Sequence, residues 1–133
     1  MKIVKILAIL IGVYALIVVA FETRIGVLQP DLGNTIVIST VDEDGDSRDR
    51  VITRLEVGGR MYVSAHHWPR AWYRRAMANP EVEITREGER KPYRAARVTG
   101  DEYDRVAAAY PRPVIGAILQ GFAPRRIVRL DPR

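Results

Sequence analysis

The chain begins with an uninterrupted apolar run in residues 1–21, whose only charged side chains are Lys2 and Lys5. As a helix, the stretch from Ile3 to Phe21 would be roughly 28 Å long at about 1.5 Å per residue. This is close to the hydrocarbon thickness of a bilayer, about 30 Å. Because no polar face interrupts the run, we predict a single-pass transmembrane anchor in residues 1–21. A cleaved signal peptide is the alternative, because Val18-Val19-Ala20 resembles a small-residue cleavage site.

Positive charges are distributed unevenly about this run, because two lysines lie at its start and Arg24 follows its end. The positive-inside bias favours a cytoplasmic N-terminus and a soluble domain outside the cell membrane. The margin is one or two charges, so the side of the membrane stays open. Residues 22–33, with the breakers Pro30 and Gly33, are expected to be a linker, and residues 34–133 a soluble domain.

After the linker, the hydrophobic pattern changes to short stretches in which apolar and polar residues alternate. The predicted strands are residues 34–41, 48–57, 60–65, 81–86, 90–98 and 126–130. Helical spacing predicts helices over residues 69–78, 99–110 and 114–122. Strands joined by such short hairpins cannot form a parallel doubly wound sheet. We therefore predict a mainly β domain with helices (α+β), built as a six-stranded antiparallel barrel with the helices outside.

Two of the predicted helices carry boundary signals. Asn79-Pro80 ends the first of them, because the residue before a proline is disfavoured in the helical region. Thr99 is a suitable N-cap for the second, and Glu102 three residues later completes a capping box.

Composition narrows the function classes. The chain has no cysteine, so disulfides and thiolate metal sites are excluded. The formal net charge is +5, and two of the positive charges lie in the apolar N-terminal run. That balance is too modest to indicate nucleic-acid binding, so no nucleic-acid partner is predicted. Most of the basic residues are arginine, which prefers carboxylate and phosphate partners.

Acidic residues between the first two predicted strands invite a calcium-loop interpretation. Asp42, Asp44 and Asp46 have the required spacing, but Ser47 stands where the loop needs glycine and Thr53 where it needs glutamate. A solvated hairpin turn fits better. The only two histidines are adjacent and point in different directions, so no metal site is predicted.

The chemistry of the chain is concentrated in residues 61–80, which hold both histidines, both tryptophans and three arginines. A strand there gives way to a helix, whose N-terminus presents free N–H groups and partial positive charge. We predict that a flat, anionic ligand binds at this corner. The candidate contacts are Ser64, His66, His67, Trp68, Trp72 and Arg75. The alternatives are a turn with structural histidines, a core tryptophan, a capping serine and solvated arginines.

A second candidate anion site lies on the preceding strand. Arg48, Arg50 and Arg54 are separated by even numbers of residues, so their side chains share one face of the strand. Pairing with acidic residues of neighbouring strands is the alternative.

The strand, small polar turn, Pro-x-x-Trp-Tyr helix and Asn-Pro stop resemble the deazaflavin-dependent nitroreductase and quinone reductase family. Members of that family are split β-barrels, related in fold to the pyridoxamine-phosphate oxidase-like flavin proteins. The resemblance covers most of the chain, from near Asn34 to its end. The residues that carry it are Ser64, Pro69, Trp72, Tyr73, Asn79, Pro80, Val82-Glu83-Ile84, Val98-Thr99-Gly100-Asp101-Glu102 and Arg129-Leu130-Asp131-Pro132.

The resemblance implies an oxidoreductase that binds reduced deazaflavin (coenzyme F420) or FMN, and the predicted N-terminal anchor would attach it to a membrane. It would pass hydride to a lipophilic acceptor, either quinone-like or nitro-aromatic. The cofactor would perform the chemistry, and the protein would bind and orient it. In such barrels the cofactor often lies near a dimer interface, so a homodimer is a further expectation.

The chain departs from the family at its first hairpin, which is usually glycine-rich and basic. Residues 42–49 are acidic here, and carboxylates repel a phosphate chain. The Ala-His-His-Trp turn also replaces a glycine-rich turn. The alternative function is therefore a non-catalytic split-barrel module that binds lipid, haem or a protein partner and has lost its cofactor.

Overall fold

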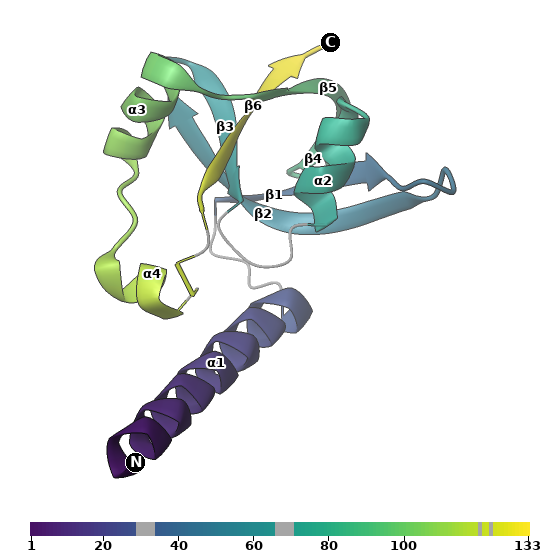
Figure 1. Ribbon diagram of the computed structural model, residues 1–133. Helices are drawn as coiled ribbons and strands as arrows, with labels where there is room; N and C mark the ends of the chain where they lie inside the picture. The colour runs from purple at the N-terminus through teal and green to yellow at the C-terminus, as the bar shows by residue number, and fades with distance from the viewer. Residues whose placement is uncertain (29–33, 66–70, 120, 123) are drawn as a thin grey trace.

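The computed structural model describes residues 1–28, 34–65, 71–119, 121–122 and 124–133 (Figure 1). In chain order the elements are α1 (Lys2–Leu28), β1 (Thr35–Val41), β2 (Ser47–Val57), β3 (Arg60–Ala65), α2 (Ala71–Ala78), β4 (Glu81–Arg86), β5 (Glu89–Arg97), α3 (Gly100–Ala109), α4 (Val114–Leu119) and β6 (Arg126–Pro132).

The six strands form one closed barrel in the order β1-β2-β3-β6-β5-β4, and β4 pairs with β1 to complete it. Every neighbouring pair is antiparallel. The predicted α+β fold, a six-stranded antiparallel barrel with helices, is therefore confirmed. Closure pairs the strand edges that would otherwise expose unsatisfied backbone groups.

Tight hairpins allow six short strands to close in this way. Gly58 and Gly59, between β2 and β3, have φ of 60° and 73°, a combination that suits a two-residue turn and favours glycine. The β4–β5 turn has the same character, with φ of 52° at Glu87 and 79° at Gly88.

Two apolar clusters hold the barrel together, one inside it and one outside it. The inner cluster joins the inward-facing side chains of the strands to Trp72 and Ala76 of α2. The outer cluster packs Val106 of α3 against Tyr62 and Ile127. Tyr62 and Val63 are adjacent in β3 and fully buried in different clusters, as the alternation of a strand requires.

One expectation about the helices is wrong, and it concerns the capping box. The N-terminal helix runs to Leu28 and so continues into the predicted linker of residues 22–33, because no proline occurs before Pro30. The capping box does not form, because the side chain of Thr99 makes no capping hydrogen bond. The carboxylate of Glu102 instead accepts from Nη1 of Arg129, at 2.8 and 3.0 Å.

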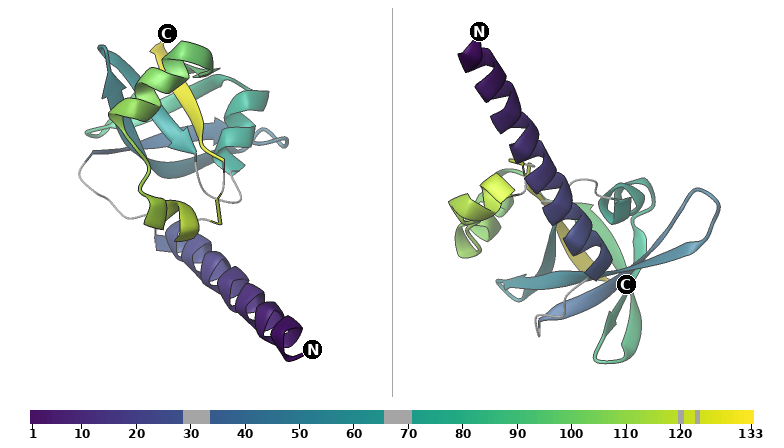
Figure 2. Two further views of the ribbon diagram at one scale, coloured as in Figure 1. Left: turned by 60° about the vertical axis from the view of Figure 1, so that its left-hand side comes forward. Right: turned by 90° about the horizontal axis from the view of Figure 1, so that it is seen from below.

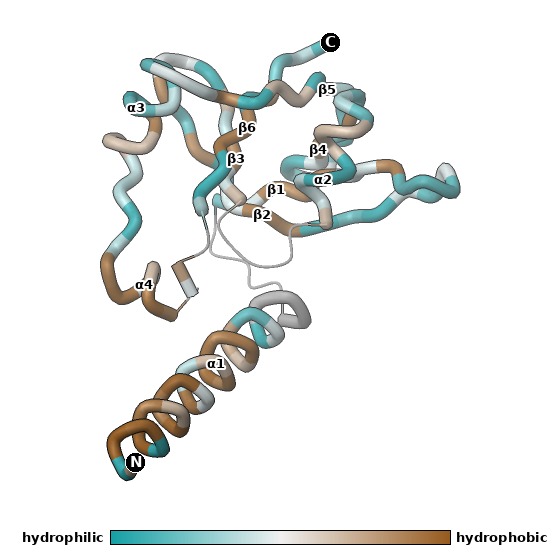
Figure 3. The backbone as a smooth tube through the Cα atoms, in the orientation of Figure 1, coloured by the Kyte–Doolittle hydropathy of each residue, from teal (hydrophilic) through white to brown (hydrophobic). Residues whose placement is uncertain are grey.

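The N-terminal helix projects away from the barrel and is apolar along most of its length (Figures 1 and 3). By length and composition, its segment Lys2–Arg24 could cross a membrane. The short helix α4 lies against α1 in both views of Figure 2, and the hydroxyl of Tyr14 donates to the carbonyl of Ile118 at 2.9 Å.

Candidate functional site

One predicted contact lies where α2 crosses the end of the first hairpin. Nε of Arg75 donates to the hydroxyl oxygen of Thr40 at 2.8 Å. Thr40 is fully buried at the end of β1, directly opposite Arg48 of β2. The sequence analysis missed Thr40, although the hairpin register places it opposite a candidate arginine.

The three arginines of β2 share the face of the strand that points into the barrel. Each lies an even number of residues from Ile52, a member of the inner apolar cluster, and so shares its face of the strand. Arg50 also lies opposite Ile38, another member of that cluster. Directly opposed residues of antiparallel strands lie on the same face, so the predicted common face is present and faces inward.

Two of these arginines form ion pairs with nearby carboxylates. Nε of Arg48 lies 2.9 Å from Oδ2 of Asp42, and Nη1 of Arg54 lies 2.8 Å from Oε1 of Glu56. Burial lowers the pKa of the third, Arg50. Both arginines therefore pair with acidic residues, but neither partner lies on a neighbouring strand, because Asp42 is in the turn before β2 and Glu56 is on β2 itself.

The guanidinium of Arg75 occupies an electrostatically costly position. Its pKa is lowered first by burial and then by the like charge of Arg48, which the carboxylate of Asp42 partly offsets. Within the described parts of the chain, Arg75 forms no ion pair. A bound anion at this corner would relieve that cost, because an opposite charge stabilises the cation.

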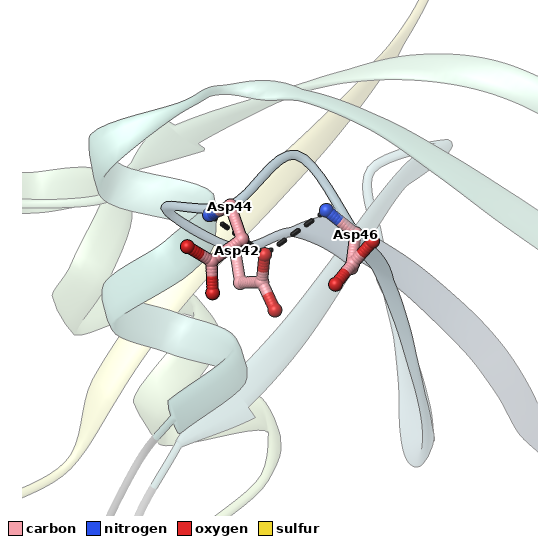
Figure 4. A group of neighbouring side chains, drawn as sticks. All are labelled: Asp42, Asp44 and Asp46. Carbon is pink, nitrogen blue, oxygen red and sulfur yellow. Dashed lines mark hydrogen bonds between the residues drawn. The ribbon is translucent and has the colours of Figure 1, made fainter.

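The acidic hairpin is largely organised around one carboxylate (Figure 4). Oδ1 of Asp42 accepts the backbone N–H groups of Asp44 and Asp46, each at 3.0 Å. Its Oδ2 accepts from Arg48, and this bond is the main cause of the lowered pKa of Asp42. The carboxylates of the three aspartates come within 4.8 Å of one another. Because the turn already uses both oxygens of Asp42, we assign this cluster to turn formation.

A second acidic residue of the hairpin also has an internal partner. The hydroxyl of Ser39 donates to Oδ1 of Asp49 at 2.6 Å. The hairpin therefore repels an anion at the Arg75 corner less than its composition suggested.

Ser64 lies on the other side of the barrel wall. It pairs with Ile127, a member of the outer cluster, and so faces away from the inward-facing arginines. Its hydroxyl oxygen accepts from Nε of Arg125 at 2.9 Å, and Nη1 of Arg125 donates to the carbonyl of Tyr110 at 2.6 Å. No local pattern around Arg125 signalled this role.

The remaining predicted contacts divide into two groups. Trp72 is 9% exposed in the inner cluster, with its ring edge-on to Tyr73 at a centroid distance of 6.1 Å. It therefore packs α2 onto the barrel. His66, His67 and Trp68 lie outside the described residues, and their assignment stays a prediction.

A cavity of about 310 Å³ opens at the opposite hairpin, between β4 and β5. Its lining consists of Met61, Ile84, Arg86, Glu87, Glu89, Lys91 and Tyr93. None of the predicted site residues that the structure describes lines this cavity, so it is separate from the Arg75 corner.

Comparison with known proteins gives one family match. Residues 15–114 match the model of the F420H(2)-dependent quinone reductase family, which is most of the chain. A comparison with curated proteins returned no match.

Solved structures with a similar fold include proteins that are described as having different functions. The haem storage protein HutZ of Vibrio cholerae has a TM-score of 0.57 at 20% identity, covering 86% of each chain. A structure described as a domain-swapped dimer has a TM-score of 0.57 at 21% identity, covering 74% of this chain and 81% of that chain. An F420-H2 dependent reductase has a TM-score of 0.53 at 21% identity, covering 72% of this chain and 94% of that chain.

Proposed function

The chain belongs to the F420H(2)-dependent quinone reductase family, and from this premise we propose that it is a membrane-anchored, deazaflavin-dependent reductase. The acceptor we propose is quinone-like or nitro-aromatic. The family match over residues 15–114 is the observation that carries the proposal. It favours coenzyme F420 over FMN, because F420H(2) is the reductant in the family's name.

The Arg75 corner supports this assignment because its charges suit an anionic cofactor. Arg75 is held in place by the buried hydroxyl of Thr40, and burial and like charge both disfavour its cationic form. We propose that Arg75 grips an anionic group of the cofactor. Arg50 of β2, which lies opposite Ile38 of β1, would add positive potential, whereas the ion pair with Asp42 offsets the charge of Arg48.

The chain's own role in this proposal is to bind and orient the cofactor, which carries the redox chemistry. When bound, a reduced deazaflavin supplies a hydride, and a quinone that accepts this hydride takes up one proton to become a hydroquinone. Trp72 and Ala76 hold α2 on the barrel and so fix the position of Arg75 on that helix. The segment that includes His66, His67 and Trp68 directly precedes α2 and contributes further predicted contacts.

Membrane anchoring belongs to the same proposal. The segment Lys2–Arg24 is long and apolar enough to span a bilayer. A barrel tethered there would meet lipophilic acceptors at high local concentration. A signal sequence passes the same test, so membrane extraction of the mature protein separates the two.

The binding test uses the full chain purified in detergent. Coenzyme F420 is titrated into the protein while its fluorescence is followed, with FMN and haemin as parallel ligands. We expect saturable binding of coenzyme F420 at micromolar concentration. Absence of binding at that concentration would contradict the proposal.

The alternative function is a non-catalytic binding barrel. Its support is that solved structures of similar fold include haem proteins, among them HutZ and a haem-binding protein from Mycobacterium smegmatis. A haem propionate is also an anion that arginine can grip. Tight haemin binding with a sharp absorbance band, together with no response to coenzyme F420, would favour this alternative.

A further inference from the structure

The exposed apolar surface of the chain is concentrated in two places. Among the described residues, every exposed large apolar side chain lies either in residues 1–19 or in residues 114–119 and 121–122, here called the α4 segment. The exposed members of the α4 segment are Val114, Ile115, Ile118 and Phe122. Ile115 is 65% exposed and Phe122 is 63% exposed. Exposed apolar side chains gathered on one short segment indicate a surface with a partner.

The α4 segment packs directly on the apolar N-terminal helix (Figure 2). Besides the Tyr14–Ile118 hydrogen bond, Gly121 approaches Val18 very closely. A Cβ atom built on Gly121 would lie 2.9 Å from Cγ1 of Val18. Close backbone approach at a small residue is how helices pack in lipid, where tight van der Waals contact drives association.

The contact points set the depth of the α4 segment along α1. At about 1.5 Å per residue, Val18 lies roughly 5 Å and Tyr14 roughly 10 Å before Phe21, where the apolar run ends. If α1 spans the bilayer, these residues lie inside the leaflet that adjoins the barrel. The α4 segment is then at the same depth, and Figure 3 shows both as hydrophobic.

We propose that the α4 segment inserts into this leaflet beside α1 and exposes its apolar side chains to lipid chains. This inference rests on the membrane anchoring proposed above. The barrel would then be attached to the membrane at two points, which would hold it in one orientation.

Backbone satisfaction supports a lipid environment, because an unpaired polar group is costly there. The N–H of Ala117 donates to the carbonyl of Pro113 at 3.0 Å, and the N–H of Phe122 donates to the carbonyl of Ala117 at 2.9 Å. The carbonyl of Ile118 accepts from both Gly121 and Tyr14.

Charge at the edges of the α4 segment is complementary to a phospholipid surface. Arg112 precedes the segment, and Arg126 follows it. Arginines that flank an apolar segment favour the headgroup level, where anionic lipids attract them.

The same region ties the α4 segment to the barrel. Arg125 donates a hydrogen bond to the carbonyl of Tyr110, which joins the two ends of the loop that carries α4. It also donates to the hydroxyl of Ser64 near the end of β3, on the outer face of the barrel. Arg125 therefore links the base of the α4 loop to the barrel.

Site-directed labelling tests the proposal in the full chain, which has no native cysteine. Ile115→Cys and Glu89→Cys are each labelled with the fluorophore NBD and reconstituted into vesicles of phosphatidylcholine and phosphatidylglycerol. Both positions are exposed, so labelling should not disturb folding, and Glu89 in the β4–β5 hairpin is the matched control. We expect the label at residue 115 to emit at shorter wavelength and to be quenched strongly by lipids with nitroxide on the acyl chain. The label at residue 89 should respond only to aqueous quenchers.

Two results would overturn the proposal. Equal aqueous quenching of both labels would show that the α4 segment lies in water. Protection of the residue 115 label from both lipid and aqueous quenchers would show that a second copy of the chain covers it. No deazaflavin is present, so either result leaves the reductase proposal to its own test.

Discussion

At the scale of single residues, the role of each arginine follows from its partners. Arg48 and Arg54 neutralise carboxylates within the same hairpin or strand, and Arg125 bonds a hydroxyl and a carbonyl. Arg75 differs from Arg48 and Arg54 because its side-chain bond goes to a neutral hydroxyl, at a position where burial and Arg48 disfavour its charge. It is therefore better suited than either of them to hold an external anion.

Replacing this arginine should weaken cofactor binding. We expect Arg75→Met to raise the Kd for coenzyme F420 about tenfold to a hundredfold, because a hydrogen bond to a charged group contributes about 1.5–3 kcal/mol. Fluorescence titration of the purified variant measures the change. Arg105→Met, at an exposed position of α3, is the control and should leave the Kd unchanged. Equal affinities for the two variants would place the anion elsewhere.

Asp42 makes the first hairpin sensitive to acid. Its folded-state pKa lies below its usual value, chiefly because Arg48 donates to it. The stabilisation is therefore complete above the ordinary pKa of an aspartate and is lost as the pH falls through the lower folded value. We expect Asp42→Asn to flatten the dependence of the free energy of unfolding on pH in this acidic window.

Denaturant unfolding at several acidic pH values tests this expectation. Glu43→Gln, at an exposed position of the same turn, should keep the slope of the parent chain. A parent-like slope in Asp42→Asn would mean that the turn bonds contribute nothing measurable to stability.

At the scale of elements, strands could be predicted closely because alternation is a local property. The bounds of β3 and β4 match the predicted ranges, and the other strands begin or end within two residues of theirs. The C-terminal ends of α2 and α3 lie within one residue of the predicted ends, whereas the capping bonds of α3 could not be predicted, because a distant residue decides them. Thr99 and Glu102 have the spacing of a capping box, but the guanidinium of Arg129 in β6 competes for the carboxylate.

That competing interaction should stabilise the fold. Arg129 contacts both carboxylate oxygens of Glu102 and both of Asp131, at 2.8–3.0 Å, and these bonds raise its pKa. The groups are partly exposed, so we expect Arg129→Met to lower the free energy of unfolding by about 1–2 kcal/mol.

Chemical denaturation of the full chain in detergent gives this value. The comparison variant is Arg133→Met, whose exposed ion pair with Glu81 should contribute less than about 0.5 kcal/mol. Equal losses in the two variants would show that the link between α3 and β6 adds nothing beyond a surface pair.

The contact between α1 and α4 gives a second prediction for elements. In the labelled Ile115→Cys chain, Gly121→Ala should reduce quenching by acyl-chain nitroxides, because its Cβ would collide with Val18. Adding Val18→Ala should restore quenching. The positive φ of Gly121 strains alanine in either background. Failure of the second substitution to restore quenching would therefore point to strain rather than the helix contact.

At the scale of the whole molecule, the predicted barrel architecture is present, and its closure explains why the candidate residues separate. Ser64 and the arginines of β2 are all near strand ends in the sequence, yet the barrel wall lies between them. Alternation shows which residues share a face, but only strand order shows which face is interior. Thr40 and Arg125 could not be found from local patterns, because their partners lie 35 and 61 residues away along the chain.

A single-turnover reaction tests the central claim most directly. The full chain in detergent is mixed anaerobically with reduced coenzyme F420 and a soluble quinone, and oxidation of the cofactor is followed by absorbance. We predict oxidation that needs both protein and quinone and that slows in Arg75→Met but not in Arg105→Met. The protein concentration is chosen so that all of the cofactor is bound. Oxidation at the rate measured without protein would then contradict the assignment as a reductase.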